Sequence, residues 1–120
     1  MRTPTEDELR EFYSASLKAA SVVVRSSNSI IQEYNLKQNS IRYYEPKGND
    51  IIKKMRKRKG ALGIVIANIT APSGATYSKT IQRNYVAALE ELKTKITAAV
   101  PEGIETYVDG SRIYIFKVLK

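Results

Sequence analysis

The sequence contains no cysteine and no histidine. The absence of cysteine excludes disulfide bonds, thiolate catalysis and cysteine-ligated zinc. The absence of histidine removes the commonest general base and the commonest side-chain ligand of transition metals. Any catalysis would therefore have to rest on carboxylates, lysine, tyrosine or hydroxyl groups.

The 12 acidic residues form no cluster that would hold a hard metal ion. Most of them belong to an expected helix start, a helix surface or a turn: Glu6, Asp7, Glu8, Glu11, Glu90, Glu91 and Asp109. Only Glu45 and Asp50 flank a turn beside a strongly basic segment, where a metal ion would face a phosphate. We expect no enzymatic activity, no metal site and no cofactor.

Long apolar runs are also absent, since no stretch approaches the roughly 20 residues of a membrane span. The first eight residues are acidic and lack the apolar core of a signal peptide. At 120 residues and 42% hydrophobic content, the chain is large enough to form one domain with an ordinary core. These features predict a single cytoplasmic domain, 1–120, that does not enter the membrane.

What the sequence does have is a concentration of positive charge. Residues 53–59 place six cations among seven residues without an acid: Lys53, Lys54, Arg56, Lys57, Arg58 and Lys59. The whole chain has 20 Lys and Arg against 12 Asp and Glu, so without this segment 14 basic residues face 12 acids. Crowded like charges repel one another, and a polyanion relieves that repulsion. The segment therefore predicts a nucleic-acid partner, either DNA or RNA.

The residues before this segment extend the same pattern. Residues 42–59 carry eight basic residues against Glu45 and Asp50, a net charge of +6. Phosphates attract Lys and Arg, and unstacked bases pack on flat aromatic rings. The predicted contacts outside the segment are therefore Arg42, Tyr43, Tyr44 and Lys47. The two tyrosines also fit a strand with one core ring and one surface ring, and this interpretation stays open.

Two long helices are expected. The first covers about residues 4–35, with Thr3 as N-cap and Pro4 in the first turn, or a capping box formed by Thr5 and Glu8. The polar residues 26–29 are the point where it would break or kink. The second helix covers about residues 82–100, and a start at Ser78 competes with a strand over 75–81.

Strands are expected near 39–45, 62–70, 103–108 and 112–119, with Asp109-Gly110 as a type I′ turn in a final hairpin. A short helix capped by Asn49 or Asp50 would carry the basic segment. The prediction is an α+β fold in which two long helices cover one face of a mainly antiparallel sheet of four to five strands. The expected core includes Leu9, Phe12, Leu17, Val23, Ile30, Ile64, Ile66, Tyr85, Leu89, Leu92, Ile96, Ile113 and Ile115.

Two alternatives to a simple nucleic-acid-binding protein remain. Residues 78–84 with the 104–118 hairpin resemble the recognition helix and wing of a winged-helix DNA-binding regulator, although 62–70 is a poor preceding helix. The chain also fits a structural or assembly protein, such as a virion or ribosome-associated subunit. A straight first helix would leave Val22, Val23, Ile30 and Ile31 overhanging, which predicts a homodimer.

Overall fold

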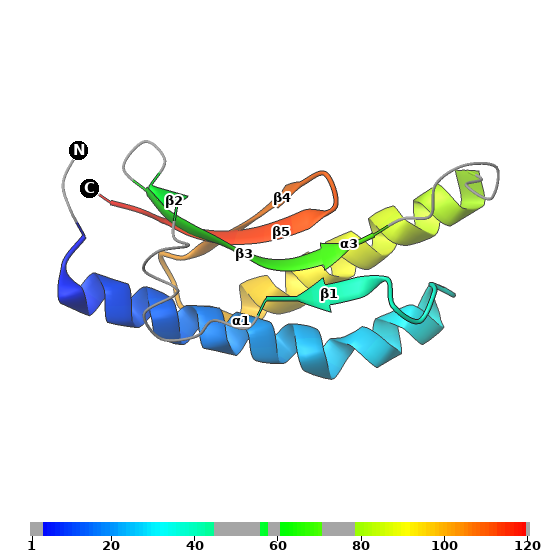
Figure 1. Ribbon diagram of the computed structural model, residues 1–120, viewed down its shortest axis with the longest axis horizontal. Helices are drawn as coiled ribbons and strands as arrows, with labels where there is room; N and C mark the ends of the chain where they lie inside the picture. The colour runs from blue at the N-terminus through cyan, green and yellow to red at the C-terminus, as the bar shows by residue number, and fades with distance from the viewer. Residues whose placement is uncertain (1–3, 45–55, 58–60, 71–78, 120) are drawn as a thin grey trace.

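The computed structural model describes residues 4–44, 56–57, 61–70 and 79–119 (Figure 1). Along the chain these residues form α1 (Glu6–Glu33), β1 (Ile41–Tyr43), β2 (Arg56–Lys57), β3 (Ala61–Ile69), α3 (Lys79–Ala99), β4 (Glu105–Asp109) and β5 (Arg112–Val118). Two long helices pack on an antiparallel sheet that ends in a hairpin. The predicted α+β fold class is confirmed.

The sheet has the strand order β1-β3-β5-β4, and β2 also pairs with β3. Strand β5 occupies one edge of β3 from Ala61 to Asn68. Strands β1 and β2 must therefore share the other edge, where β1 pairs with residues 67–69 and β2 with residues 62–63. Both helices lie on the same side of the sheet (Figure 1), α1 against β3 and β1, and α3 against β4. No described helix covers the second side.

Helix α1 begins with the capping box of Thr5 and Glu8. The Thr5 hydroxyl accepts a hydrogen bond from the Glu8 amide at 3.2 Å, and the Glu8 carboxylate accepts one from the Thr5 amide at 3.0 Å. These bonds satisfy amides that have no partner within the helix. Pro4 precedes the helix, so its predicted place in the first turn is wrong, and Thr3 lies outside the described residues.

The expected break near Ser27 does not occur. The helix runs without interruption to Glu33, and the Ser27 hydroxyl donates to the carbonyl oxygen of Val23 one turn earlier. A serine that bonds back in this way stays compatible with a helix, although it competes with backbone bonding elsewhere. Helix α1 is therefore one rod of 28 residues, about 42 Å long at 1.5 Å per residue.

The buried side of α1 differs from the predicted one at Leu17, which is 41% exposed. Small residues occupy the contact instead, namely Ala15, Ser16 and Ala19. They allow α1 to approach both the sheet and α3 closely, and the buried Ser16 hydroxyl is satisfied by the carbonyl oxygen of Phe12 at 2.8 Å. Leu9 and Leu89 pack against the core while remaining partly exposed.

The argument for a homodimer depended on apolar residues left uncovered at the end of α1. Val22, Val23 and Ile30 are instead buried within the domain, and Ile31 packs against the same core. The second half of the helix is therefore covered by the chain's own sheet and α3. The premise was wrong, and the fold gives a homodimer no support.

Helix α3 begins by Lys79, which excludes a strand over 79–81 and favours the earlier helix start. Residues 75–78 lie outside the described part of the chain. The final hairpin is confirmed, but its turn is displaced by one residue. Asp109 still pairs with Arg112, so the two-residue loop is Gly110-Ser111. Gly110 has a φ of 62°, whereas Ser111 has no positive φ, which fits the type II′ pattern rather than type I′.

The basic segment also differs from its prediction where it is described. Arg56 and Lys57 form β2, not a helix, and their backbone pairs with Gly63 and Leu62 of β3. The remaining residues of the predicted short helix, including Asn49 and Asp50, lie outside the described residues. The physical reason is that the N-terminal half of β3 has an edge that β1 does not reach, and β2 pairs with its backbone groups there.

Candidate nucleic-acid interface

The candidate interface starts at the edge of β3 that β1 and β2 share. Arg42 pairs with Asn68, and the Tyr44 amide donates to the carbonyl oxygen of Ile66 at 3.0 Å. Three residues further along β3, Gly63 pairs with Arg56. Tyr44 and Arg56 therefore both lie on this edge of β3. Residues 42–44 and 56–57 of the predicted binding region thus follow one another along one edge of β3.

The predicted contacts of β1 are accessible. Arg42 is exposed, and Tyr43 and Tyr44 are 47% and 44% exposed. Neither tyrosine is a core ring, so the interpretation of one core and one surface ring is wrong. Lys47, Lys53, Lys54, Arg58 and Lys59 lie outside the described residues. The structure thus places the exposed side chains of β1 on the edge of β3 with which the backbone of Arg56 and Lys57 also pairs.

Ser40 anchors the start of β1. Its carbonyl oxygen accepts a hydrogen bond from the Thr70 amide at 2.8 Å, which joins it to the end of β3. Its hydroxyl lies 3.0 Å from the Tyr85 hydroxyl of α3, and both residues are buried. A buried pair of hydroxyls that satisfy each other resists separation, because either one alone would lose its partner. The exposed residues that follow therefore project from a fixed strand.

The side chains on the sheet face opposite the helices form a second group of exposed residues. The sequence analysis did not assign a function to them. In β5 the buried Ile113 and Ile115 alternate with Arg112, Tyr114 and Phe116, which are exposed or partly exposed. The sequence already showed this alternation over 112–118. It indicated two faces, but it did not reveal that neither of the two described helices covers one of them.

Arg112 begins β5 and lies on this face, where it pairs with Asn68 of β3, the residue that pairs with Arg42 of β1. The pKa of Arg112 is raised above its ordinary value, chiefly by a side-chain hydrogen bond with Tyr114 and by that residue's charge when ionised, with smaller contributions from Tyr44 and Asp109. The guanidinium therefore keeps its positive charge under all ordinary conditions. The same influences place Tyr44, Tyr114 and Arg112 within electrostatic reach of one another.

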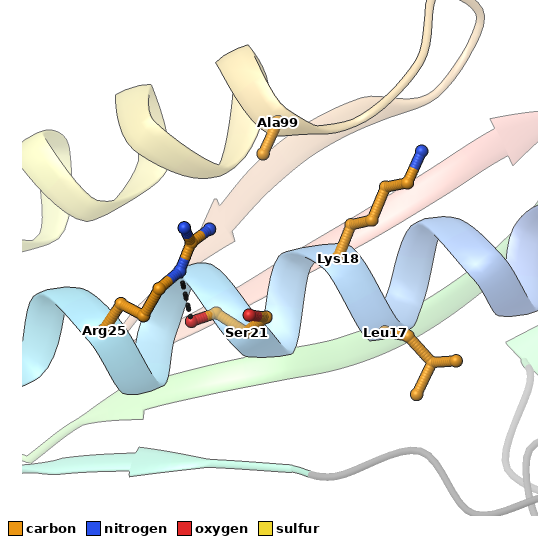
Figure 2. A pocket seen from close by; sticks show the side chains of 5 residues that line it. All are labelled: Leu17, Lys18, Ser21, Arg25 and Ala99. Carbon is orange, nitrogen blue, oxygen red and sulfur yellow. Dashed lines mark hydrogen bonds between the residues drawn. The ribbon is translucent and has the colours of Figure 1, made fainter.

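The helical side of the domain has a shallow groove between α1 and the end of α3 (Figure 2). It has a volume of about 370 Å³ and is lined by Leu17, Lys18, Ser21, Arg25 and Ala99. Lys18 and Arg25 rise from α1 on the side that faces α3. The Arg25 Nε–H donates to the Ser21 carbonyl oxygen at 3.4 Å. An adjoining hollow adds Lys95 to these cations. The groove is basic but open, and no buried polar group points into it.

The described residues contain no candidate for a metal site or for a membrane-spanning helix. No three acidic residues there lie close enough together to hold a metal ion. No helix there is long and apolar enough to cross a membrane. Glu45 and Asp50, the pair singled out for a metal facing a phosphate, are outside these ranges.

Comparison of the chain with protein-family models, curated proteins and solved structures found no match. The function must therefore be argued from the geometry and charge of this chain alone.

Proposed function

We propose that this protein binds nucleic acid without catalysing a reaction, and that the basic segment 53–59 supplies the phosphate contacts. The observation that carries the proposal is the shared edge of β3. It attaches exposed Arg42, Tyr43 and Tyr44 next to the strand that begins at Arg56. Arg56 and Lys57, two of the six cations of segment 53–59, are thereby part of the sheet, and exposed aromatic rings lie on the same edge of β3.

The pairing of Arg56 and Lys57 with β3 supports the proposal, because phosphate contacts cost less conformational entropy when the backbone that carries the cations is already positioned. Among the described residues, the ion pairs are Arg10–Glu6 and Lys117–Glu11, and neither involves Arg42 or Arg112. Arg42, on β1, therefore remains available to a polyanion, and Arg112, on β5, keeps its positive charge beside Tyr114. DNA and RNA both supply the required phosphates.

The winged-helix alternative receives no support from the described elements. A helix-turn-helix needs a helix immediately before its recognition helix, and the element described before α3 is strand β3. The assembly-protein alternative loses its main argument with the covered end of α1. Nucleic-acid binding through the β1–β2 edge is the function that the geometry favours.

The test is an affinity measurement over a salt series with a variant in which all six cations of segment 53–59 are changed to alanine. If all six meet phosphates, the log–log salt slope falls by roughly 4 units for a single strand and roughly 5 for a duplex. A matched control removes six exposed cations of the two helices and so changes the net charge equally: Arg10, Lys18, Arg25, Lys79, Arg83 and Lys95.

The expected result is that the control keeps most of the salt slope while the segment variant loses it. Equal losses in both variants would mean that total charge, not location, drives binding. A larger loss in the control would move the site to the helical groove. Wild-type protein that binds neither DNA nor RNA at low salt would refute the proposed function.

A further inference from the structure

The sheet face opposite the helices carries three aromatic side chains of the final hairpin that lie outside the buried core, Tyr107, Tyr114 and Phe116. Residues paired across antiparallel strands share a face, so the register of the sheet defines this set. Tyr114 pairs with Val65 on one side and Tyr107 on the other. Phe116 pairs with Gly63 and with Glu105. Tyr107 is 53% exposed, and Tyr114 and Phe116 are partly exposed.

The rings on this face are spaced so that each one can stack with a separate planar group. Tyr107 and Tyr114 have centroids 6.5 Å apart and planes inclined at 46°, so they do not stack on each other. Phe116 has Gly63 as its β3 neighbour, which leaves no cross-strand side chain on that side of the ring, and Glu105 of β4 is its neighbour on the other side. Tyr114 and Phe116 lie two residues apart on β5, a separation of about 6.8 Å.

That separation is about twice the roughly 3.4 Å rise between nucleotides along one strand of a duplex. Successive rings therefore match bases that have been pulled apart, not bases stacked within a helix. A duplex keeps its bases covered by their neighbours and cannot offer them to a sheet surface. A single strand can.

Acidic side chains lie toward one edge of this face and basic residues toward the other, as a single strand with its phosphates on one side would require. The acids Glu105 and Asp109 lie on β4, at one edge of the sheet. Arg42 lies on β1, at the opposite edge, where β2 also attaches the basic segment. A strand with its bases over Tyr114 and Phe116 would thus have its phosphates toward β1 and β2. A second copy of the chain fits less well, because each copy has a net charge of +8.

We infer that the open sheet face is a stacking platform for single-stranded nucleic acid, with Tyr107, Tyr114 and Phe116 under the bases and the β1–β2 edge beside the phosphates. This inference rests on the proposed function and adds to it the kind of strand that is bound. Stacking is tolerant of sequence, because every base has an aromatic face. The platform therefore selects unpaired strands with little preference among bases.

The experiment compares Tyr114→Val and Phe116→Val with wild type, using fluorescence anisotropy of a labelled 12-nucleotide oligothymidylate and a duplex of equal length. Each substitution keeps a strand-forming residue, and circular dichroism checks the fold. We expect each lost ring to weaken single-strand binding roughly 5- to 100-fold while the salt slope stays unchanged. Tyr114→Phe restores the ring and recovers the loss. Val86→Ala, at an exposed site on α3, keeps wild-type affinity.

Tyrosine emission gives an independent readout, because the chain has eight tyrosines and no tryptophan. Oligothymidylate should quench it in wild type, and less so in Tyr114→Val. Duplex binding as tight as single-strand binding, or ring variants with unchanged affinity, would overturn the platform and leave the phosphate contacts of segment 53–59 standing. Ring variants that convert a dimer to a monomer in light scattering would assign the face to a second copy. Loss of all binding in wild type would remove both proposals together.

Discussion

The hydroxyl pair between Ser40 and Tyr85 allows the attachment of β1 to be measured. The two oxygens lie 3.0 Å apart, and the residues are only 4% and 5% exposed. Tyr85→Phe removes one hydroxyl and leaves that of Ser40 buried without this partner. A buried polar group that loses its partner costs about 1–3 kcal/mol, part of which the more apolar ring offsets. We expect Tyr85→Phe to lower the unfolding free energy by about 1–2 kcal/mol.

Ser40→Ala leaves the Tyr85 hydroxyl unpaired and should cost a similar amount. Replacing both hydroxyls leaves neither one unsatisfied, so the double variant should be more stable than the sum of the single losses predicts. The expected coupling energy is about 1 kcal/mol. Urea unfolding followed by circular dichroism measures it, and each single variant should lower the midpoint by roughly 0.5–1 M.

The reasoning would be refuted by single losses that add without coupling, because the two hydroxyls would then not depend on each other. An altered dependence on urea concentration would instead indicate a changed compactness of the folded or unfolded state. Ser16→Ala provides a contrast, since that hydroxyl bonds only within its own helix, to the Phe12 carbonyl oxygen. Its removal should change stability little.

Two further predictions concern α1. Thr5→Ala removes the cap and should lower the free energy of unfolding by about 1 kcal/mol, while Thr5→Ser preserves the bond to the Glu8 amide. If both variants unfolded at the same temperature, the capping role would be contradicted. The pKa of Tyr34 is raised above 10.0, first by burial, then by the charges of Glu33 and Glu91 and by the hydrogen bond to Glu91. A raised pKa gives stability that is complete below pH 10 and declines as the pH rises through the folded-state pKa. The advantage of wild type over Tyr34→Phe in unfolding free energy should therefore shrink between pH 7 and pH 11. A difference between the two proteins that stays constant with pH in urea unfolding would count against this prediction.

The sequence predicted the long helices and the hairpin well, because each has a strong local signal. The Thr5 and Glu8 box marks one helix start, and Gly110 marks the reversal between the last two strands. The side of α1 that is buried was less accessible. Large apolar residues suggested Leu17, but close packing against two layers favours alanines, which a pattern of large residues does not detect.

The candidate site was predictable only in part for a similar reason. Charge density in the sequence singled out 53–59, and charge does not depend on how the segment folds. The strand at Arg56 and Lys57 depends instead on a vacant edge of β3, which is a property of the assembled sheet. The proposed role of Tyr114 likewise depends on which side of the sheet the helices occupy. No local pattern in the chain encodes that choice.

The irregularity in β3 has a consequence for how the length of this protein can change during evolution. Val65 pairs with Tyr114 and Ala67 with Ile113, so Ile66 opposes no residue of β5. Elsewhere in a strand, losing one residue moves everything beyond it to the opposite face. Here the loss would leave Val65 and Ala67 on their present faces. A change in length should therefore be tolerated better at this position than elsewhere along β3, although it would cost the buried Ile66 side chain and its bond to the Tyr44 amide.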